Sequence, residues 1–593
     1  LYLSSLPDLS WAKHGIHRKG TPGFSQDARR AFAQNMFHGA RYLAKLRHSD
    51  RLADALMAMQ DHVDEQAAVE DYDSVAGQQI VDEMTKRHDL FLNPKVNPLA
   101  TMATSVGFVW YLGLSPASAV VNLSQTPLVA FPLMGAKWGF RKAAAALERA
   151  SRETMGAGND LSKRLRGDEL AAFERAVKDG TIDITQAHDL AGIAQGEDQG
   201  VVWRMRPIMK AAAFMFHHAE KFNRQATFLA AYRLAKAANP AITEDEAYRQ
   251  AKDITYRSHF DYAAGNKPRI MQGNLARVVL LFKQFAQNMI YTLARQGVLA
   301  AKGDRQAAKA FGALLTSHAL AAGIFGLPLV NVLLEAASML GSTDDEPWDA
   351  EGALRNYMAE AVGPTAGAAA AHGLSRLTPW DISGRVGLDN LIFPDVREGL
   401  EGEAWAHAAA ASAAGPVLNM ALIGPAKGLA LIADGHWLRG LEAMMPAALR
   451  SGLKSVRYAT EGAQTRDGKT IVEDVGVAEW LGQAAGFSPS RVRDAGKARE
   501  IVFGLDRRIN ARRASLIRDY GDAVMAKDHG AMGRQREAVL RFNEANPDRP
   551  ITGATIVQSV RMRTMRAAEA EKGIYLPRKR RGLVEQGRFA DVE

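Results

Sequence analysis

Two groups of neighbouring titratable side chains have the residue types used in metal binding and proton transfer. His217-His218 precedes Glu220, and His259 lies two residues before Asp261. A metalloprotease site needs two histidines one helical turn apart, whereas adjacent histidines on a helix point about 100° apart. A serine-hydrolase triad needs a GxSxG nucleophile, which does not accompany the second group. We therefore interpret the first group as a helix surface and the second as a structural turn.

A Gly-Lys-Thr tripeptide and an acidic run are the other candidates for ligand chemistry. Gly468-Lys469-Thr470 looks like the end of a phosphate-binding loop, but Gly462 is one residue too far upstream and no apolar strand precedes it. We interpret the tripeptide as a surface turn. The acidic run lacks the spacing of an EF-hand, so we expect a solvated helix face rather than a cation site. Its members are Asp61, Asp64, Glu65, Glu70, Asp71 and Asp73.

The sequence contains no cysteine, which excludes disulfides, thiolate metal sites and a cysteine nucleophile. Because no catalytic constellation is present, we predict that the chain is not an enzyme and uses no cofactor and no bound metal. The chain begins with Leu1, and its first 20 residues lack the apolar core of a secretory signal. We expect it to be part of a longer or processed polypeptide.

The residue composition predicts helices almost throughout. Ala, Leu, Met, Arg, Gln and Glu dominate, while alternating runs of Val, Ile and Thr are scarce. The predicted fold class is an all-α, elongated multi-helix assembly with apolar helical hairpins. Glycine and proline clusters divide it into five predicted parts. These are a polar helical region (1–95), a helical domain (96–302), a hydrophobic helix that is a candidate membrane segment (303–345), an Ala/Gly-rich helical domain (346–500), and a basic region with a tail (501–593).

Two local patterns predict helices in the middle of the chain. Thr243 followed by Glu246 is typical of a capping box, so a helix should begin there. Farther on, apolar residues recur at helical spacing and predict one face that packs in a core. Polar neighbours such as Lys283 and Gln287 leave a base-stacking surface as the alternative. The apolar face comprises Val278, Phe282, Phe285, Met289 and Leu293.

Three stretches lack Asp, Glu, Lys and Arg, namely 96–136, 310–334 and 404–426. The first spans 41 residues, but its prolines predict two short helices joined at residues 113–116. This geometry suits a re-entrant hairpin or a hydrophobic hairpin shielded by partner subunits, and we favour a buried packing element that helps subunits assemble. The second is long enough to cross a bilayer and is the better spanning candidate, with a buried bundle helix as the alternative. The third is Ala-rich and is interpreted as closely packed helices. The predicted membrane or assembly residues are Phe108, Trp110, Leu114, Phe311, Leu315, Phe325 and Leu329.

The positive charge of the chain is concentrated near the C-terminus. The net charge is +9, and residues 501–593 hold 19 Lys and Arg against 12 Asp and Glu. Leu505, Ile509 and Leu516 fall at helical spacing, with arginines on the other faces. Such a helix binds phosphates or anionic headgroups, or packs in a bundle with its arginines in water. The predicted contacts to DNA or headgroups are Arg507, Arg508, Arg512, Arg513, Arg578, Lys579, Arg580 and Arg581.

Several segments together resemble a family of phage proteins named for a PLxRFG motif. Residues 113–128 read GLSPASAVVNLSQTPL, and KWGF at 137–140 stands in for the basic, aromatic and glycine part of the motif. Further support comes from EKFNR at 220–224, HFDY at 259–262 and FKQFAQNM at 282–289, with a weaker echo in DISGR at 381–385. The resemblance covers about residues 95–300.

Proteins of this family resemble the large internal virion, or DNA-ejection, proteins of short-tailed phages. The resemblance implies residence in the virion interior before infection, and an oligomeric conduit across the host periplasm and inner membrane after ejection. Its implied partners are further copies of the chain, other ejection proteins, the portal or tail complex, double-stranded DNA and the host inner membrane. Relatives often carry a lytic transglycosylase domain, whose Glu-Ser signature is absent here. This chain therefore resembles the C-terminal portion of such a protein.

Two alternative functions remain open at this point. The first is a DNA-binding core protein that stays inside the capsid and never meets lipid. The second is a non-catalytic scaffold region of a larger virion polyprotein. Liposome association separates the leading hypothesis from both alternatives, and salt-dependent DNA binding separates the two alternatives from each other.

Overall fold

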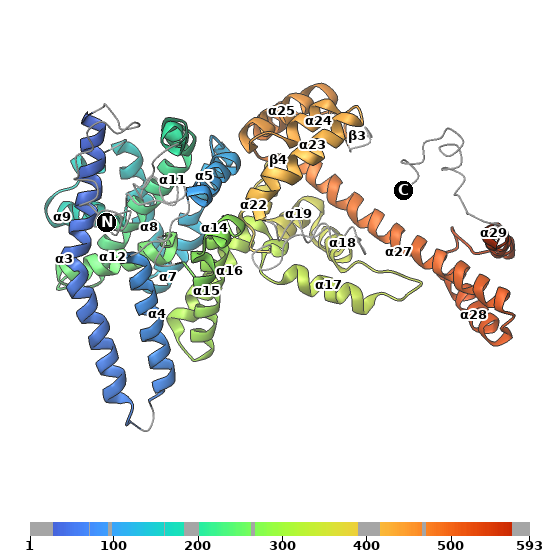
Figure 1. Ribbon diagram of the computed structural model, residues 1–593, viewed down its shortest axis with the longest axis horizontal. Coiled ribbons are helices and arrows are strands. Elements are labelled where there is room, and N and C mark those ends of the chain that lie inside the picture. The colour runs from blue at the N-terminus through green and yellow to red at the C-terminus, as the bar shows by residue number, and fades with distance from the viewer. Residues whose placement is uncertain are drawn as a thin grey trace, which may run out of the picture. The chain divides into compact units, whose positions relative to one another are not determined.

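The computed structural model confirms the predicted all-α fold class. It describes residues 28–69, 72–92, 98–158, 160–182, 201–262, 267–389, 415–464 and 470–571, and 81% of this part is helical (Figure 1). The chain forms two compact units. The first comprises residues 1–327, 372–394 and 406–490, and the second comprises 328–371, 395–405 and 491–593. The predicted five-part division stays a prediction.

The first unit begins with an antiparallel hairpin of two helices, α3 (Ala28–Gln66) and α4 (Ser74–Leu92), which lie side by side in Figure 1. Val63 and Val81 are the buried apolar side chains of the hairpin among its described residues. The side-chain amides of Gln60 and Gln78 donate to each other's oxygens at 2.8 and 3.0 Å. The hairpin is therefore held together along one face of each helix.

The joint predicted at residues 113–116 is confirmed. Helix α5 (Pro98–Leu112) ends there, and α6 (Pro116–Leu123) begins after Ser115, whose hydroxyl accepts from the Ser118 N–H at 3.3 Å. Pro127 and Pro132 do not end the helical path. Helix α6 continues through a π-helix, η1 (Thr126–Ala130), into α7 (Phe131–Trp138). Pro132 cannot donate to the Leu128 carbonyl, so that oxygen accepts instead from the Ser317 hydroxyl at 3.0 Å.

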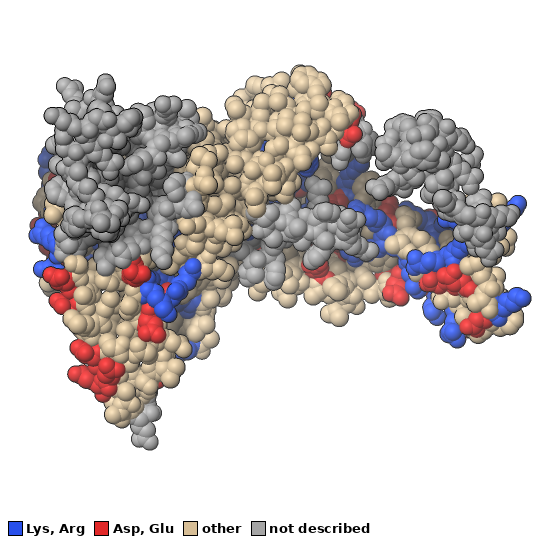
Figure 2. All heavy atoms as spheres, in the orientation of Figure 1, with Lys and Arg blue, Asp and Glu red and all other residues tan. Residues whose placement is uncertain are grey.

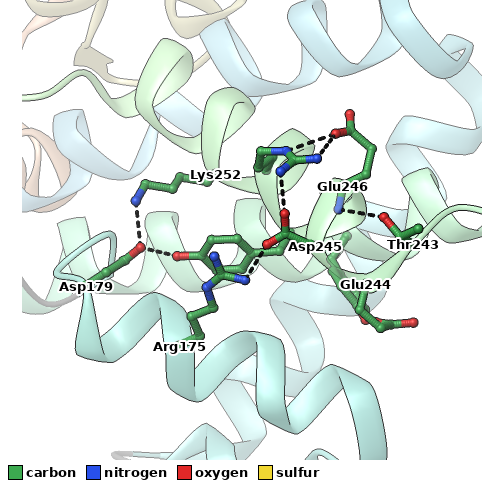
Figure 3. A network of polar contacts seen from close by, with 10 residues as sticks. Arg175, Asp179, Thr243, Glu244, Asp245, Glu246 and Lys252 are labelled. Atoms are coloured by element: carbon green, nitrogen blue, oxygen red, sulfur yellow. Dashed lines mark hydrogen bonds and ion pairs between the residues drawn. The ribbon is translucent and has the colours of Figure 1, made fainter. Parts of the chain in front are cut away.

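The main core of the first unit is centred on α11 (Val201–Ala238), and α7 contributes Met134 to it. This core also includes α8 (Phe140–Ala157), the 3₁₀ helix η2 (Leu161–Arg164), α9 (Gly167–Lys178) and α12 (Glu244–His259). The predicted start of α12 is confirmed, because the Thr243 hydroxyl accepts from the Glu246 N–H at 3.2 Å (Figure 3). The predicted burial of the charge-free stretch is confirmed in part, because Pro116–Trp138 is 56% buried. Its predicted role in subunit assembly stays a prediction.

The predicted apolar face at 278–293 does not lie on one continuous helix. The chain forms α13 (Arg269–Gln272), α14 (Asn274–Val279) and then α15 (Lys283–Ala301), and Phe282 adopts a left-handed φ of 71° between the last two. Within α15, Met289 and Leu293 are buried in a second core cluster, against which Phe285 packs. The core-packing interpretation is therefore confirmed for α15, while Phe282 packs against a separate cluster that contains Phe108.

The predicted long hydrophobic helix at 310–334 was wrong. Helix α16 (Arg305–Ala322) ends at Gly323, whose φ of 76° turns the chain into the 3₁₀ helix η4 (Ile324–Gly326). A separate helix, α17 (Val330–Gly341), begins after Leu329. The stretch divides because glycine adopts the left-handed conformation that ends a helix, and because Pro328 cannot continue one. In the sequence, Pro328 indicated a kink, whereas Gly323 gave no comparable sign that a helix ends there.

The remaining part of the first unit is built from short elements. They are the 3₁₀ helix η5 (Leu374–Leu377), α20 (Ser383–Val386), α22 (Gly415–Leu418), the π-helix η6 (Asn419–Ile423), α23 (Gly424–Ala433), α24 (Trp437–Ala443), α25 (Ala447–Glu461) and α26 (Val477–Ala485). Two antiparallel strand pairs join them. Strand β1 (Trp380–Asp381) pairs with β4 (Ser488–Pro489), and β2 (Ala463–Gln464) pairs with β3 (Thr470–Val472).

The second unit contains α17, α18 (Ala350–Val362), most of α19 (Pro364–His372), and the three C-terminal helices α27 (Ser490–Ala526), α28 (His529–Ala545) and α29 (Gly553–Glu571). Its core cluster contains Leu516, Val539, Phe542 and Ile551. The helical spacing predicted around Leu516 is thus confirmed in α27.

Candidate functional site

Three of the segments on which the predicted resemblance rests, 113–128, 220–224 and 259–262, meet in a cluster of buried polar side chains. On α11, Glu220, Asn223, Arg224 and Thr227 recur at the spacing of one helix face, and all four are almost completely buried. Asn223 donates to the Asn122 carbonyl at 2.7 Å and accepts from the Thr126 hydroxyl at 2.8 Å. The polar residues Asn122 of α6 and Thr126 of η1 therefore contact α11 rather than solvent.

Arg224 is the largest completely buried side chain in the described residues and is the centre of this cluster. Its guanidinium pairs with Glu220 one helical turn earlier, at 3.1 Å. It also donates to the carbonyl oxygens of Thr181, His259 and Phe260, at 3.2, 3.3 and 2.8 Å. A buried charge is tolerated only when it is paired and hydrogen bonded, and Arg224 meets both conditions.

His259 lies at the C-terminal end of α12 and is completely buried. One ring nitrogen, Nε2, is 2.8 Å from the Thr227 hydroxyl, and Nδ1 is 3.5 Å from Gln125 Oε1. Burial, together with the nearby Arg224 charge, lowers the pKa of His259 well below its ordinary value. A neutral imidazole held between two helices fits the structural turn that the sequence predicted at this position.

A second, more exposed network ties α12 to α9 and to the turn after α9 (Figure 3). Arg175 contacts Asp245 at 2.7 Å and lies 4.0 Å from the centre of the Tyr248 ring, while Lys252 contacts Asp179 at 2.6 Å. Burial alone would raise the pKa of Asp179, but hydrogen bonds from Lys252, Thr181 and Tyr248 lower it overall. Both networks therefore fix the mutual positions of α9, α11 and α12.

The seven predicted membrane or assembly residues lie in different surroundings. Phe108 is completely buried and packs edge-to-face on Phe216, and Phe325 is buried beside the His372 ring. Trp110, Phe311 and Leu315 are half-buried. Leu114 and Leu329 are exposed, and each adopts a left-handed backbone conformation next to a helix end. No single surface unites the seven residues.

The eight basic residues predicted to contact DNA or headgroups also lie in different surroundings. Arg512 pairs with Asp345 at 2.8 Å, and Arg513 donates to the carbonyls of Arg549 and Pro550, so both side chains have partners within the second unit. Arg507 is exposed and Arg508 is half-buried on α27. The four predicted residues Arg578, Lys579, Arg580 and Arg581 lie outside the described residues.

An apolar surface on helices α22–α25 is the clearest candidate for contact with another phase. We call it the apolar platform. Of the charged side chains between residues 415 and 461, Lys427, Asp434 and Glu461 are exposed, and the others are half-buried or buried. Figure 2 shows the corresponding part of the facing surface as almost continuous uncharged atoms. The exposed apolar residues of the platform are Leu418, Leu422, Leu429, Ile432, Trp437, Leu449 and Val456.

The interior beneath the platform is closely packed and contains an ion pair. A side chain at Gly440 would meet the Gly428 carbonyl at 2.5 Å, so the backbones of α23 and α24 are nearly in contact. Arg457 on α25 pairs with the carboxylate of Glu442 at 2.8 Å, and both side chains are largely buried. Small residues and polar pairs inside, with apolar side chains outside, are the arrangement of a helical bundle that faces lipid.

Two helical segments are long and apolar enough to cross a membrane, among the residues that the structure describes. Pro116–Trp138 is 56% buried within the protein, as expected for a core helix. Gly415–Ala433 is only 17% buried. The sequence predicted closely packed helices at residues 404–426 but not this exposed surface, and residues 404–414 lie outside the described residues. The helical spacing of Leu418, Leu422 and Leu429 was the available signal, but a charge-free pattern does not tell whether such a face is exposed or buried.

No three His, Asp or Glu side chains come together as metal ligands in the described ranges. The acidic run lies partly within them: Asp61, Asp64, Glu65 and Asp73 are exposed, whereas Glu70 and Asp71 lie outside. His218 is exposed and His217 is half-buried. The comparisons with known proteins found no matching family, no similar curated protein and no similar solved structure.

Proposed function

We propose that this chain is an internal virion protein of a phage that becomes part of an oligomeric conduit for genome delivery through the host periplasm and inner membrane. The supporting observation is the exposed apolar helix Gly415–Ala433, which is long enough to cross a bilayer yet only 17% buried. The resemblance of residues 95–300 to phage ejection proteins supports the same function. In this proposal the apolar platform is the part of the chain that contacts the host membrane.

The platform has side chains suited to lipid contact. Leu422 and Leu429 are 64% and 61% exposed, and Trp437, whose amphipathic ring suits the headgroup region, is 62% exposed. Lys427 is exposed between the two leucines and can approach anionic headgroups. Burial of one leucine side chain contributes about 1.5–3 kcal/mol, so a few such residues suffice for stable attachment.

The basic C-terminal helices supply surfaces for double-stranded DNA in the same proposal. Arg534, Arg536 and Arg541 are exposed on α28, and Arg561 and Arg566 are exposed on α29. Figure 2 shows basic and acidic atoms interleaved on this part of the chain. Contacts of this kind are independent of sequence and weaken as salt rises. These exposed arginines also favour the alternative of a capsid-internal DNA-binding core protein.

Flotation with lipid vesicles tests the proposal. We expect the full chain to float with vesicles that contain anionic lipid. The double variant Leu422→Glu, Leu429→Glu should partition about 100-fold less, because two leucines that the lipid would bury are replaced by charges. The matched control is Val298→Glu, Leu320→Glu, which changes two similarly exposed apolar residues on α15 and α16.

Failure of the unmodified chain to float at any lipid composition would contradict membrane contact, as would an equal loss in the control variant. A core protein that never meets lipid would instead bind duplex DNA in a salt-dependent manner and would not float. A scaffold region would do neither.

A further inference from the structure

The outward face of α3 carries an ordered stripe of exposed side chains. Val63 and the Gln60 amide face α4, so the opposite side of α3 is left open. Six residues follow this open side at alternating steps of four and three, the spacing of a coiled-coil seam. All six are exposed, and we call them the charge stripe: Arg47, Arg51, Asp54, Ala58, Asp61 and Glu65.

The sign of the charge reverses along α3. From Ala28 to Arg51 the helix has six basic residues and one acidic residue, whereas from Leu52 to Gln66 it has four acidic residues and no basic one. The charge stripe follows the same order, with two arginines followed by three carboxylates. Figure 2 shows acidic atoms gathered toward the lower end of this hairpin. A face of this kind is complementary to itself when reversed in direction.

We propose that the α3–α4 hairpin is a self-association arm, through which two copies of this chain join by an antiparallel contact of their charge stripes. In this register Arg47 of one copy faces Glu65 of the other, and Arg51 faces Asp61. The two-fold symmetry forms each ion pair twice. Ala58 then faces Asp54 near the axis, where its small side chain lets the two helices approach.

The residues at the two ends of the charge stripe favour the antiparallel register, and the charges disfavour a parallel one. Leu43 is exposed one helical turn before Arg47, and Val69 is exposed in the turn that follows α3, so each end of the ion-pair ladder has an apolar side chain beside it. A parallel pairing would place arginine against arginine and carboxylate against carboxylate, which is destabilising. The complementarity is of α3 with itself, so the partner is a second copy of this chain. The inference does not depend on the proposed function.

Charge reversal tests the arm without disturbing the fold, because every altered side chain is exposed. Arg47→Glu, Arg51→Glu makes an all-acidic stripe, and Asp61→Arg, Glu65→Arg makes a nearly all-basic one. Surface ion pairs contribute little singly, but each variant converts four of them into repulsive contacts. In sedimentation equilibrium of the full chain at low salt, we expect each variant alone to self-associate at least about tenfold more weakly than the unmodified chain.

An equimolar mixture of the two variants should associate at least as tightly as the unmodified chain, since the acidic and basic stripes now match. Failure of the mixture to recover, or unchanged self-association of either variant, would overturn the proposal. So would a monomeric unmodified chain under the same conditions.

A spin label tests the antiparallel direction independently of affinity. The chain has no cysteine, so His48→Cys gives a single labelling site on an exposed position beside the stripe. The antiparallel register places the two labels about 24 Å apart along the helix axis, whereas a parallel register leaves them roughly 10 Å apart. A distance near the shorter value would contradict the antiparallel arm even if association were observed.

Discussion

Arg224 and His259 join segments that lie far apart in the sequence. Arg224 donates to backbone carbonyls after α9 and at the end of α12, while His259 bridges Thr227 on α11 and Gln125 before η1. Because these groups are buried, the loss of one partner leaves another unsatisfied. Arg224 and His259 thus hold α11, α12 and the residues after α9 together through buried hydrogen bonds.

The buried His259 makes stability depend on pH. Its folded pKa is lowered by burial and by Arg224, while an unfolded histidine titrates near 6.5, so the unfolded chain binds more protons below that pH. The contribution of His259 is therefore fully present above about pH 6.5 and is lost as pH falls through the folded pKa. We expect its contribution to the free energy of unfolding to decline by up to about 1.4 kcal/mol per pH unit in that window.

Urea denaturation between pH 7 and pH 5 measures this slope in the unmodified chain and in His259→Gln, which should show a shallower slope. Thr227→Val is the matched control, since it removes the hydroxyl partner but keeps the imidazole. The control should be less stable at every pH by about 1 kcal/mol and keep its slope. An unchanged slope in His259→Gln would exclude His259 as the source.

At the scale of elements, the sequence predicted the helix starts that depend on contacts between neighbouring residues. The Thr243 cap and the joint at Pro116 were predictable, because a hydroxyl and a proline act on neighbouring amides. The break at Gly323 was not, because glycine inside an apolar run fits a helix interior or a helix end equally well. Which of the two apolar helices is buried, Pro116–Trp138 or Gly415–Ala433, depends on distant partners that no local pattern names.

The buried cluster shows the same limit for the candidate site. Asn223 and Arg224 were visible as a motif, but the Thr126 hydroxyl lies 97 residues from Asn223 in the chain and the Thr181 carbonyl lies 43 residues from Arg224. Such pairings follow from tertiary packing. Sequence reasoning could therefore mark these residues without assigning their partners.

The close contact of α23 and α24 leads to a prediction for this helical pair. A Cβ at Gly440 would lie 2.5 Å from both the Gly428 carbonyl and Ile432, so Gly440→Ala should force the helices apart and destabilise the first unit by about 1–3 kcal/mol. Gly452 on α25 is the matched control, because no atom lies within 4 Å of its Cβ position. Gly452→Ala should stabilise by about 0.5–1 kcal/mol through helix propensity.

Thermal unfolding monitored by circular dichroism compares the two glycine variants. Equal tolerance of both substitutions would show that α23 and α24 do not pack through their backbones. A loss of stability in Gly452→Ala would contradict the open space beside Gly452 on α25.

At the scale of the whole molecule, the two units have separate hydrophobic cores. The first unit has its largest core around α11, where Leu229 is almost completely buried, and the second has a smaller core in which Phe542 has no exposed surface. Each unit also contains ion pairs between its own residues. Arg224 pairs with Glu220 in the first unit, and Arg512 pairs with Asp345 in the second. Cooperative unfolding follows compact units, so two units with no shared core predict two cooperative transitions.

Differential scanning calorimetry of the full chain should therefore resolve two transitions that respond to different substitutions. Leu229→Ala leaves a cavity in the first unit and should lower its transition only, at a cost of about 2–5 kcal/mol. Phe542→Ala should lower the other transition by about 3–5 kcal/mol, because a larger side chain is removed from a smaller core. A single transition that both substitutions displace would mean that the two units unfold together. The apolar platform and the basic helices would then belong to one cooperative unit, and their proposed roles could not be separated by unfolding one of them.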